Sequence, residues 1–419
     1  MIINQLSDKK LDFIATLIIF IGSFIFYYLG CIELLDAGFY ERINLAFDLD
    51  QAHYFHSVGQ DMSSTSPLPI KHPFIYLYHY IVIVLNSIGF SEAVAVILIS
   101  NFFHSSSLVV SFFIFRCMNR SVLESSFLTI GLAGTSTYIS TGLVLDVYSL
   151  SILWISLIFL IVCRAEYENH QFSVWLRAAI SVMAIGTTTY LMILVFLMEI
   201  LLVKRVDKSF IDSLRNSDID KQFFRVFSLG LLLFFIVYFQ VIYDVIQDPV
   251  GILKRVFWTV NRPGGKEGIL QVFSVFSVFS IISPIISTIA LPEGILMIDL
   301  RIMSFSVIGW VAVGIMLVSI SLKCQKNQYF VILLFCLSWL IINILFHMVY
   351  QYRGSLFLYC GHFILAVWIL FVTQIDIEKS RFGWQEYFYK PLDKIIIYVF
   401  PFFIWGNNIY LHENIMILI

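Results

Sequence analysis

A short polar stretch, FDLDQAHYFH (residues 47–56), lies between two strongly apolar segments and gathers side chains that can exchange a proton. Asp48 and Asp50 supply carboxylates, and His53 and His56 supply imidazoles. A carboxylate held beside an attacking hydroxyl can act as a general base. This patch therefore poses a choice between two classes of membrane protein, an enzyme and a transporter.

A second stretch, KHPFIYLYHY (71–80), joins charge to an aromatic-rich helix start. Pro73 suits the first turn of a helix, which would leave Lys71 and His72 at the membrane surface. A cation there is well placed for an anionic lipid headgroup. An ordinary interfacial anchor has the same composition, so both interpretations stay open.

The composition of the whole chain indicates a polytopic membrane protein that is all helical. Of 419 residues, 59% are hydrophobic and 13% are charged, whereas a soluble domain is about one quarter charged. The net charge of −2 gives no reason to expect a nucleic-acid partner. The six cysteines lack metal-ligand spacing, so we expect small buried hydrophobes and neither a metal site nor another cofactor.

Apolar runs long enough to cross a bilayer predict about eleven or twelve helices in one membrane domain, residues 1–419. The longest early interruption is a loop over 33–73, in which Glu41–Ser57 could form a helix. The runs are 13–32, 74–90, 93–115, 122–142, 143–163, 174–202, 222–244, 271–290, 303–322, 329–349, 355–374 and 393–412.

Basic residues predict the orientation, because cytoplasmic loops are enriched in lysine and arginine. Lys9 and Lys10 place the start of the chain inside and the 33–73 loop outside. If every run spans once, Arg116 and Arg120 would face outside. Keeping both 164–173 and the basic loop 203–221 cytoplasmic requires 174–202 to cross twice, as two short helices broken at GTTTY (186–190). Somewhere in 174–290 a run must therefore be broken, re-entrant or interfacial.

The stretch DQAHYFHSV (50–58), followed by the 71–80 stretch, resembles a hallmark of the GT-C glycosyltransferases. These membrane enzymes include the protein O-mannosyltransferases and the aminoarabinose transferase of lipid A. Their first outer loop carries D-E-x-x-Y at the start of a short helix. Asp50 matches the leading acid and Tyr54 the aromatic residue, whereas Gln51 replaces the second acid.

The family loop ends in K/H-P-P-L, which Lys71, His72 and Pro73 match, with Phe74 replacing the second proline. A third similarity is the LVLD element at 143–146, which would make Asp146 an outer-face carboxylate. The resemblance covers residues 1–202 as a GT-C-like core, and 203–419 would be variable C-terminal helices.

The resemblance implies a glycosyltransferase that takes a sugar from an undecaprenyl-type polyprenyl phosphate donor and passes it to an acceptor hydroxyl. Size and architecture are similar to those of the glucosyltransferases that decorate O-antigen. This similarity points to glucose, to modification of lipopolysaccharide or another envelope glycan, and to a multi-pass protein of the bacterial inner membrane. The expected partners are the donor, a glycan or lipid-linked acceptor, and membrane lipids.

The resemblance assigns the catalytic base to Asp50, with Asp48 as second candidate. Their spacing turns the two side chains to different sides of a helix, so one site would use one of them. Either could instead be an N-cap, Asp146 could be a helix cap, and the basic residues could be membrane anchors. The candidates for donor phosphate binding are Lys71, His72, Arg353, Lys254, Arg255 and Arg262, and those for substrate contact are Tyr54, Asp146, His347 and Tyr352.

Three other functions remain open. A flippase or transporter of a lipid-linked saccharide would place ionisable residues along a path inside the bundle. An O-antigen polymerase or ligase uses similar substrates but commonly carries its large outer loop late in the chain. A non-catalytic membrane partner is the third.

Overall fold

The computed structural model describes residues 2–41, 51–59, 72, 74–170, 172–204, 279–282, 287–290, 296–299, 330–349, 357–374 and 386–410, with single positions between 221 and 250 and at 413. These residues are helical apart from connections and one two-stranded hairpin. Among them, three helices are long and apolar enough to cross a membrane, over Lys9–Asp36, Glu92–Cys117 and Val147–Glu168. The expected helical, membrane-protein character is therefore supported.

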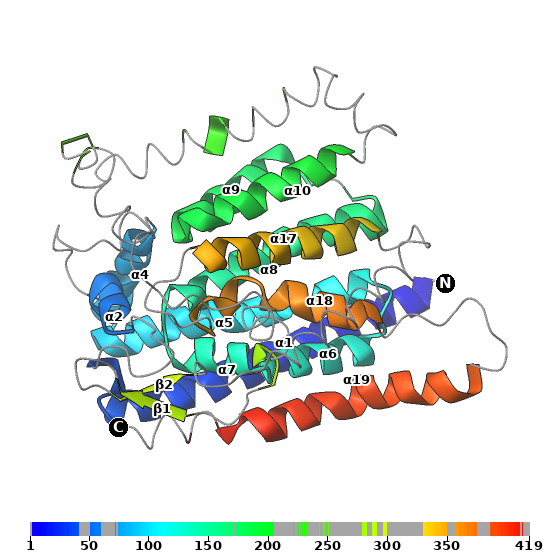
Figure 1. Ribbon diagram of the computed structural model, residues 1–419, viewed down its shortest axis with the longest axis horizontal. Coiled ribbons are helices and arrows are strands. Elements are labelled where there is room, and N and C mark those ends of the chain that lie inside the picture. The colour runs from blue at the N-terminus through cyan, green and yellow to red at the C-terminus, as the bar shows by residue number, and fades with distance from the viewer. Residues whose placement is uncertain are drawn as a thin grey trace.

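Among these three helices, Glu92–Cys117 packs between the other two (Figure 1). The helix α1 (Ile2–Asp36) runs antiparallel to α5 (Glu92–Cys117), because Arg116 Nε lies 2.7 Å from Asp12 Oδ1. The helix α8 (Val147–Glu168) runs parallel to α5, since Cys117 Sγ donates a hydrogen bond to Glu168 Oε1 at 3.2 Å. We call the end of the bundle with Arg116 the Lys9 end and the opposite end the Asp146 end.

The predicted single run 122–142 is two helices, α6 (Val122–Ala133) and α7 (Ser136–Leu143). The break lies at Gly134 and Thr135. A Cβ atom on Gly134 would lie 2.4 Å from the Trp405 ring, and the Thr135 side chain caps α7 by accepting a hydrogen bond from Tyr138 N. The two helices together lead from the Lys9 end to the Asp146 end (Figure 1).

The predicted break in 174–202 is confirmed. The helix α9 (Val174–Thr187) is followed by the short 3-10 helix η2 (Thr189–Leu191) and by α10 (Met192–Lys204). An ion pair joins Arg177, early in α9, to Glu199, late in α10, so the two helices form an antiparallel hairpin. Its turn is directed to the Asp146 end.

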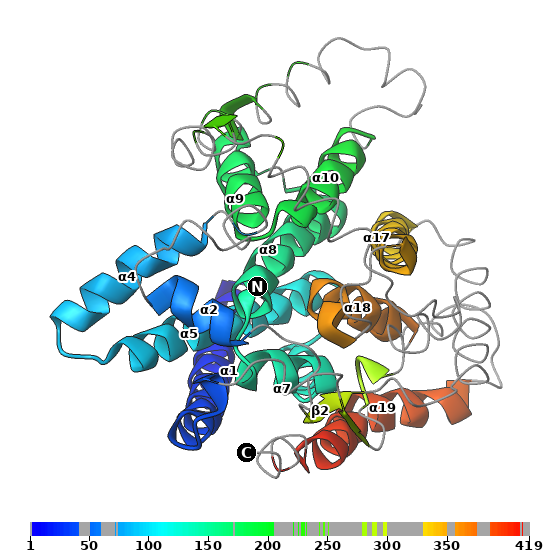
Figure 2. The ribbon, with the colours of Figure 1, turned by 60° about the vertical axis from the view of Figure 1, so that its left-hand side comes forward.

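Three short elements lie at the Asp146 end, namely η1 (Phe39–Glu41), α2 (Gln51–Gly59) and α4 (Ile75–Ser87). The helix expected over Glu41–Ser57 is seen in α2, and Glu41 ends η1; residues 42–50 lie outside the described residues. The run 74–90 was expected to cross the bilayer, but α4 lies across the end of the bundle (Figures 1 and 2). Residues 88–91 lead from α4 directly to the start of α5, which is at this same end.

The later helices are α17 (Phe330–Val349), the 3-10 helix η4 (Phe357–His362), α18 (Ile364–Gln374) and α19 (Glu386–Asn408). The strands β1 (Ser287–Ala290) and β2 (Leu296–Asp299) pair antiparallel, with Ser287 opposite Asp299. The apolar run 271–290 therefore ends in a strand, and the helix-only expectation is wrong there. The run 303–322 lies outside the described residues, as does most of 222–244.

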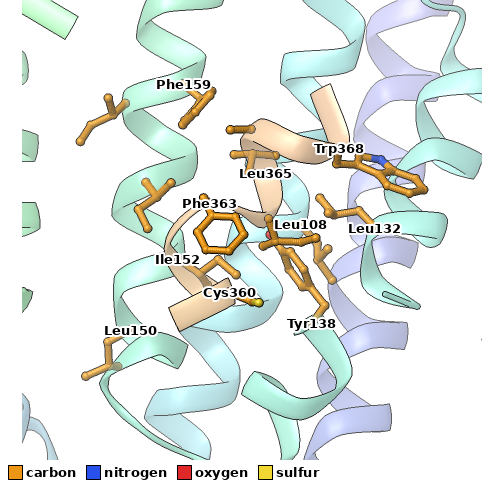
Figure 3. Close-up of a cluster of buried hydrophobic side chains, with 14 of the residues drawn as sticks. Leu108, Leu132, Tyr138, Leu150, Ile152, Phe159, Cys360, Phe363, Leu365 and Trp368 are labelled. Carbon is orange, nitrogen blue, oxygen red and sulfur yellow. The ribbon is translucent and has the colours of Figure 1, made fainter. Parts of the chain in front are cut away.

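The later helices join the core of the early ones. Figure 3 shows Phe363 and Leu365 packed among side chains of the α5–α8 region. Trp368 Nε1 donates a hydrogen bond to the Leu128 carbonyl at 3.0 Å, and Trp405 Nε1 donates to the Ile130 carbonyl at 2.7 Å. These bonds fix α18 and α19 against α6.

Candidate functional site

Three of the predicted site residues, Tyr54, His72 and Asp146, have described side chains, and all three lie at the Asp146 end. His347 belongs to α17, and only its backbone is described. The other predicted residues lie outside the part of the chain that the structure describes: Asp48, Asp50, Lys71, Lys254, Arg255, Arg262, Tyr352 and Arg353. The site is therefore built from the first three residues and their neighbours.

His72 contacts the C-terminal end of α9. Its Nδ1 atom lies 2.9 Å from the Thr187 carbonyl oxygen, and the backbone N–H of Phe74 donates to the Gly186 carbonyl at 2.7 Å. The last carbonyls of a helix have no partner within the helix, so the segment 72–74 satisfies them from another part of the chain. We call this contact the His72–α9 joint.

The His72–α9 joint determines which imidazole nitrogen of His72 carries a proton. A carbonyl oxygen only accepts hydrogen bonds, so Nδ1 of His72 carries a proton. A second proton on this side chain would therefore be carried by Nε2. The carbonyl end of a helix also favours positive charge, so the joint places His72 where an imidazolium is stabilised.

Glycine is required at the joint. A Cβ atom on Gly186 would lie 2.1 Å from Cδ2 of Phe74, whose side chain is buried. The break itself follows from the sequence Thr187-Thr188-Thr189, because β-branched residues fit poorly in a helix. Thr188 has extended backbone angles, φ −149° and ψ 112°. We call these three residues the threonine turn.

Hydroxyl groups from three elements meet at the threonine turn. Thr188 Oγ1 lies 2.8 Å from Ser151 Oγ of α8, and Thr187 Oγ1 lies 3.0 Å from the Tyr78 hydroxyl of α4. Trp154 Nε1 donates to the same Tyr78 hydroxyl at 3.2 Å. The result is a hydrogen-bonded layer that joins α4, α8 and the α9–α10 hairpin. The sequence analysis identified the break but not this layer.

Asp146 is the N-cap of α8. Its Oδ1 atom accepts a hydrogen bond from Val147 N at 2.6 Å, and the side chain is buried. A carboxylate is favourable at a helix N-terminus, where the N–H groups are unpaired. The capping interpretation is thus confirmed, and a role toward substrate stays a proposal.

Tyr54 connects α2 to this region. Its hydroxyl lies 2.8 Å from Ser100 Oγ of α5. Burial raises the pKa of the Tyr54 hydroxyl well above its usual range; the bond with Ser100 lowers that pKa by less, and the nearby Tyr78 and Asp146 raise it. Tyr54 is therefore a neutral hydroxyl, close to both Tyr78 and Asp146.

The arrangement offers groups that can recognise an anion. A histidine held at a helix C-terminus lies beside threonine, serine and tyrosine hydroxyls. Their protons bond the Met183 and Val147 carbonyls and one another, so a hydroxyl has to give up such a bond to donate to a phosphate oxygen. Within the described ranges, no three histidine, cysteine, aspartate or glutamate side chains come together as metal ligands. Among the residues named above, Asp146 and His72 are the groups that can act as a base.

Three ionisable side chains inside the bundle, Arg177, Glu199 and His104, were missed by the sequence analysis. Arg177 Nη1 lies 2.7 Å from Glu199 Oε2, and their side chains are 7% and 2% exposed. His104 is buried in α5, with Nε2 3.1 Å from the Tyr138 carbonyl. The available signal was an isolated ionisable residue within an apolar run, which is costly in a bilayer and therefore marks a site of interest.

Comparison of the sequence with protein-family models gives no match, and a search of curated proteins gives no match either. The resemblance to the GT-C enzymes therefore depends on the residues quoted above and on their arrangement.

Proposed function

We propose that the chain is a GT-C-type glycosyltransferase of the bacterial inner membrane. It would move a sugar, with glucose favoured, from undecaprenyl phosphate to an acceptor hydroxyl of O-antigen or another envelope glycan. The observation that supports the proposal is the His72–α9 joint. It brings the segment matching the family's K/H-P element onto a turn rich in hydroxyl groups.

In this proposal the donor phosphate binds at the joint. His72 and Lys71 supply positive charge, and Thr188 supplies a hydroxyl group 3.4 Å from His72 Nδ1. A departing phosphate needs such groups because negative charge develops on it as the bond to the sugar breaks. Lys254, Arg255 and Arg353 are further candidates for the same role.

Asp50 is the proposed base, since it directly precedes α2, the helix that carries Tyr54. Its carboxylate would accept the proton of the acceptor hydroxyl while the hydroxyl oxygen bonds to the anomeric carbon. The bond from that carbon to the phosphate oxygen breaks, and the electron pair leaves with the polyprenyl phosphate. Asp146, Tyr54, His347 and Tyr352 are proposed to contact the sugar or the acceptor.

The test is sugar transfer in isolated membranes, with labelled polyprenyl phosphate glucose and candidate acceptors. Asp50→Asn should abolish incorporation of label without lowering the amount of folded protein. Asp36→Asn is the matched control, because Asp36 is an exposed carboxylate at the same end of the bundle and ends α1. Substantial transfer by the Asp50→Asn protein would remove Asp50 from the mechanism.

A second candidate function has its own support. The ion pair of Arg177 with Glu199, and the buried His104, place ionisable groups within the bundle, as expected of a flippase or transporter. A transporter would move a lipid-linked saccharide across vesicles without forming a new glycosidic bond. This function would be favoured if the protein has no sugar-transfer activity, translocates the lipid-linked saccharide, and loses that translocation in the Arg177→Met variant.

A further inference from the structure

The helix α4 has both of its ends at the Asp146 end of the bundle. At its start, Phe74 N donates to the Gly186 carbonyl beside the threonine turn. At its finish, residues 88–91 lead to Glu92, where α5 begins. Because α5 and α1 are antiparallel and joined by the ion pair at the Lys9 end, Glu92 is at the far end from Arg116. The path of α4 therefore lies within one end of the bundle (Figure 2).

The outward side of α4 is as apolar as its inward side. Ile75, Tyr78 and Val82 are buried against the bundle, whereas Tyr80, Val84 and Ile88 are 66%, 60% and 67% exposed. Residues 80–90, YIVIVLNSIGF, contain no aspartate, glutamate, lysine, arginine or histidine. A helix exposed to water would carry polar residues on the outward side, so this composition points to contact with lipid.

Two other helices also carry exposed apolar side chains. Ile21, Ile25 and Leu29 are exposed on α1, which is long enough to cross a bilayer. On α5, to which α4 is joined, Phe102 is also exposed and packs edge-on against Phe20 of α1. Exposed apolar side chains are thus found on α1 and α5 as well as on α4.

We propose that α4 lies in the leaflet at the Asp146 end, along the plane of the membrane. The acyl chains of that leaflet pack against Tyr80, Val84 and Ile88, and α4 does not cross the bilayer. Helices that lie in the interface bury an apolar face at the boundary between headgroups and acyl chains. The proposal depends on the chain being embedded in a membrane, and it is independent of sugar transfer.

The depth of α4 in the bilayer tests the proposal. Single cysteines at Tyr80, Val84 and Ile88 are spin-labelled in lipid bilayers, and collision with oxygen is compared with collision with a water-soluble nickel complex. A crossing helix rises about 1.5 Å per residue, so labels at 80 and 88 would differ in depth by about 12 Å. Leu11 and Ile18 on α1 give the gradient of a crossing helix, and the unsubstituted protein gives the background.

We expect oxygen to dominate at all three positions, at one shallow depth. A gradient like that of α1 would show that α4 crosses. Dominance of nickel collisions would show that α4 faces water. Exclusion of both reagents would show that protein, such as a second copy, covers this surface. Each of these three results overturns the proposal, and labels at Ile83 and Ser87 repeat the test where a first set disturbs folding.

Sugar transfer by the same labelled proteins is measured separately. If the labels on α4 are not at the expected depth but sugar is still transferred, only the position of α4 is contradicted. If the labels are at the expected depth but the protein never transfers sugar, only the enzymatic proposal is contradicted.

Discussion

Replacing Gly186 with alanine should disrupt the His72–α9 joint. The new methyl group would lie 2.1 Å from Cδ2 of the buried Phe74, whereas carbon atoms pack comfortably at about 3.5–4.0 Å. Phe74 would have to move by about 1.5 Å, the difference between these distances. Its backbone N–H now donates to the Gly186 carbonyl at 2.7 Å, and that bond would be strained or lost.

The magnitude follows from these two effects. Overpacking a buried site costs about 1–3 kcal/mol, and a lost backbone hydrogen bond costs about 0.5–1.5 kcal/mol. We expect Gly186→Ala to lower the free energy of unfolding by about 2–4 kcal/mol in total. Gly22→Ala is the control, because Gly22 lies in α1 with nothing within 4 Å of an added Cβ. It should be neutral or stabilising by about 0.5–1 kcal/mol, as alanine favours a helix.

Equilibrium unfolding in detergent measures both variants, and the double variant Gly186→Ala with Phe74→Leu identifies the cause. A smaller side chain at 74 makes room for the methyl group, so the double variant should lose less than the sum of the two single losses. If Gly186→Ala changes the free energy of unfolding as little as Gly22→Ala does, the close contact between residues 186 and 74 is refuted. Additive losses would refute the assignment of the clash to Phe74.

Two further predictions concern buried polar groups. Arg177→Met should lower the free energy of unfolding by about 3–5 kcal/mol, since it leaves Glu199 buried without its partner. Adding Glu199→Leu should recover part of this loss in chemical denaturation. No recovery would contradict the pairing. Tyr54→Phe should lower the free energy of unfolding by about 0.5–1.5 kcal/mol, because the hydrogen bond to Ser100 is lost. Because the folded state raises the pKa of Tyr54, stability should fall as pH rises above about 10, the pKa of an unfolded tyrosine. The phenylalanine variant should lose less stability over that range in pH-dependent unfolding, and equal losses would contradict the burial of an ionisable hydroxyl.

The local features of this chain were the easiest to predict from sequence. The α9–α10 break was predicted from the distribution of basic residues and placed at 186–190, where glycine and three threonines weaken a helix. The capping of α8 by Asp146 was one of two interpretations, and it follows from side-chain chemistry within one turn. Each of these features depends on a few adjacent residues.

The position of α4 was not predictable in the same way. Its run is apolar and about as long as a crossing requires, and hydropathy is the same for a helix that crosses and one that lies across the bundle. The orientation of Arg116 was the clue, since it conflicted with a simple alternation of crossings. Its pairing with Asp12 places it at the Lys9 end. The path of α4 is therefore a second departure from simple alternation, in addition to the break in 174–202 that we expected.

Contacts between distant residues also required the structure. Arg177 and Glu199 meet only because the hairpin turns between them, and neither residue shows a partner at helical spacing. His72 and Thr187 are brought together across more than one hundred positions. Such pairings follow from packing of whole elements, which residue spacing does not encode.

Binding of polyprenyl phosphate tests the central claim most directly, because the claim is that the His72–α9 joint holds a lipid-linked phosphate. Dissociation constants for polyprenyl phosphate and for the neutral polyprenol are measured with the wild-type protein and with His72→Gln, which keeps a side-chain donor for the Thr187 carbonyl but cannot carry charge. A hydrogen bond to a charged group contributes about 1.5–3 kcal/mol, so we predict that the variant binds polyprenyl phosphate at least about tenfold more weakly and binds polyprenol unchanged. Equal affinity of both proteins for polyprenyl phosphate would contradict the claim, as would an equal loss for both ligands.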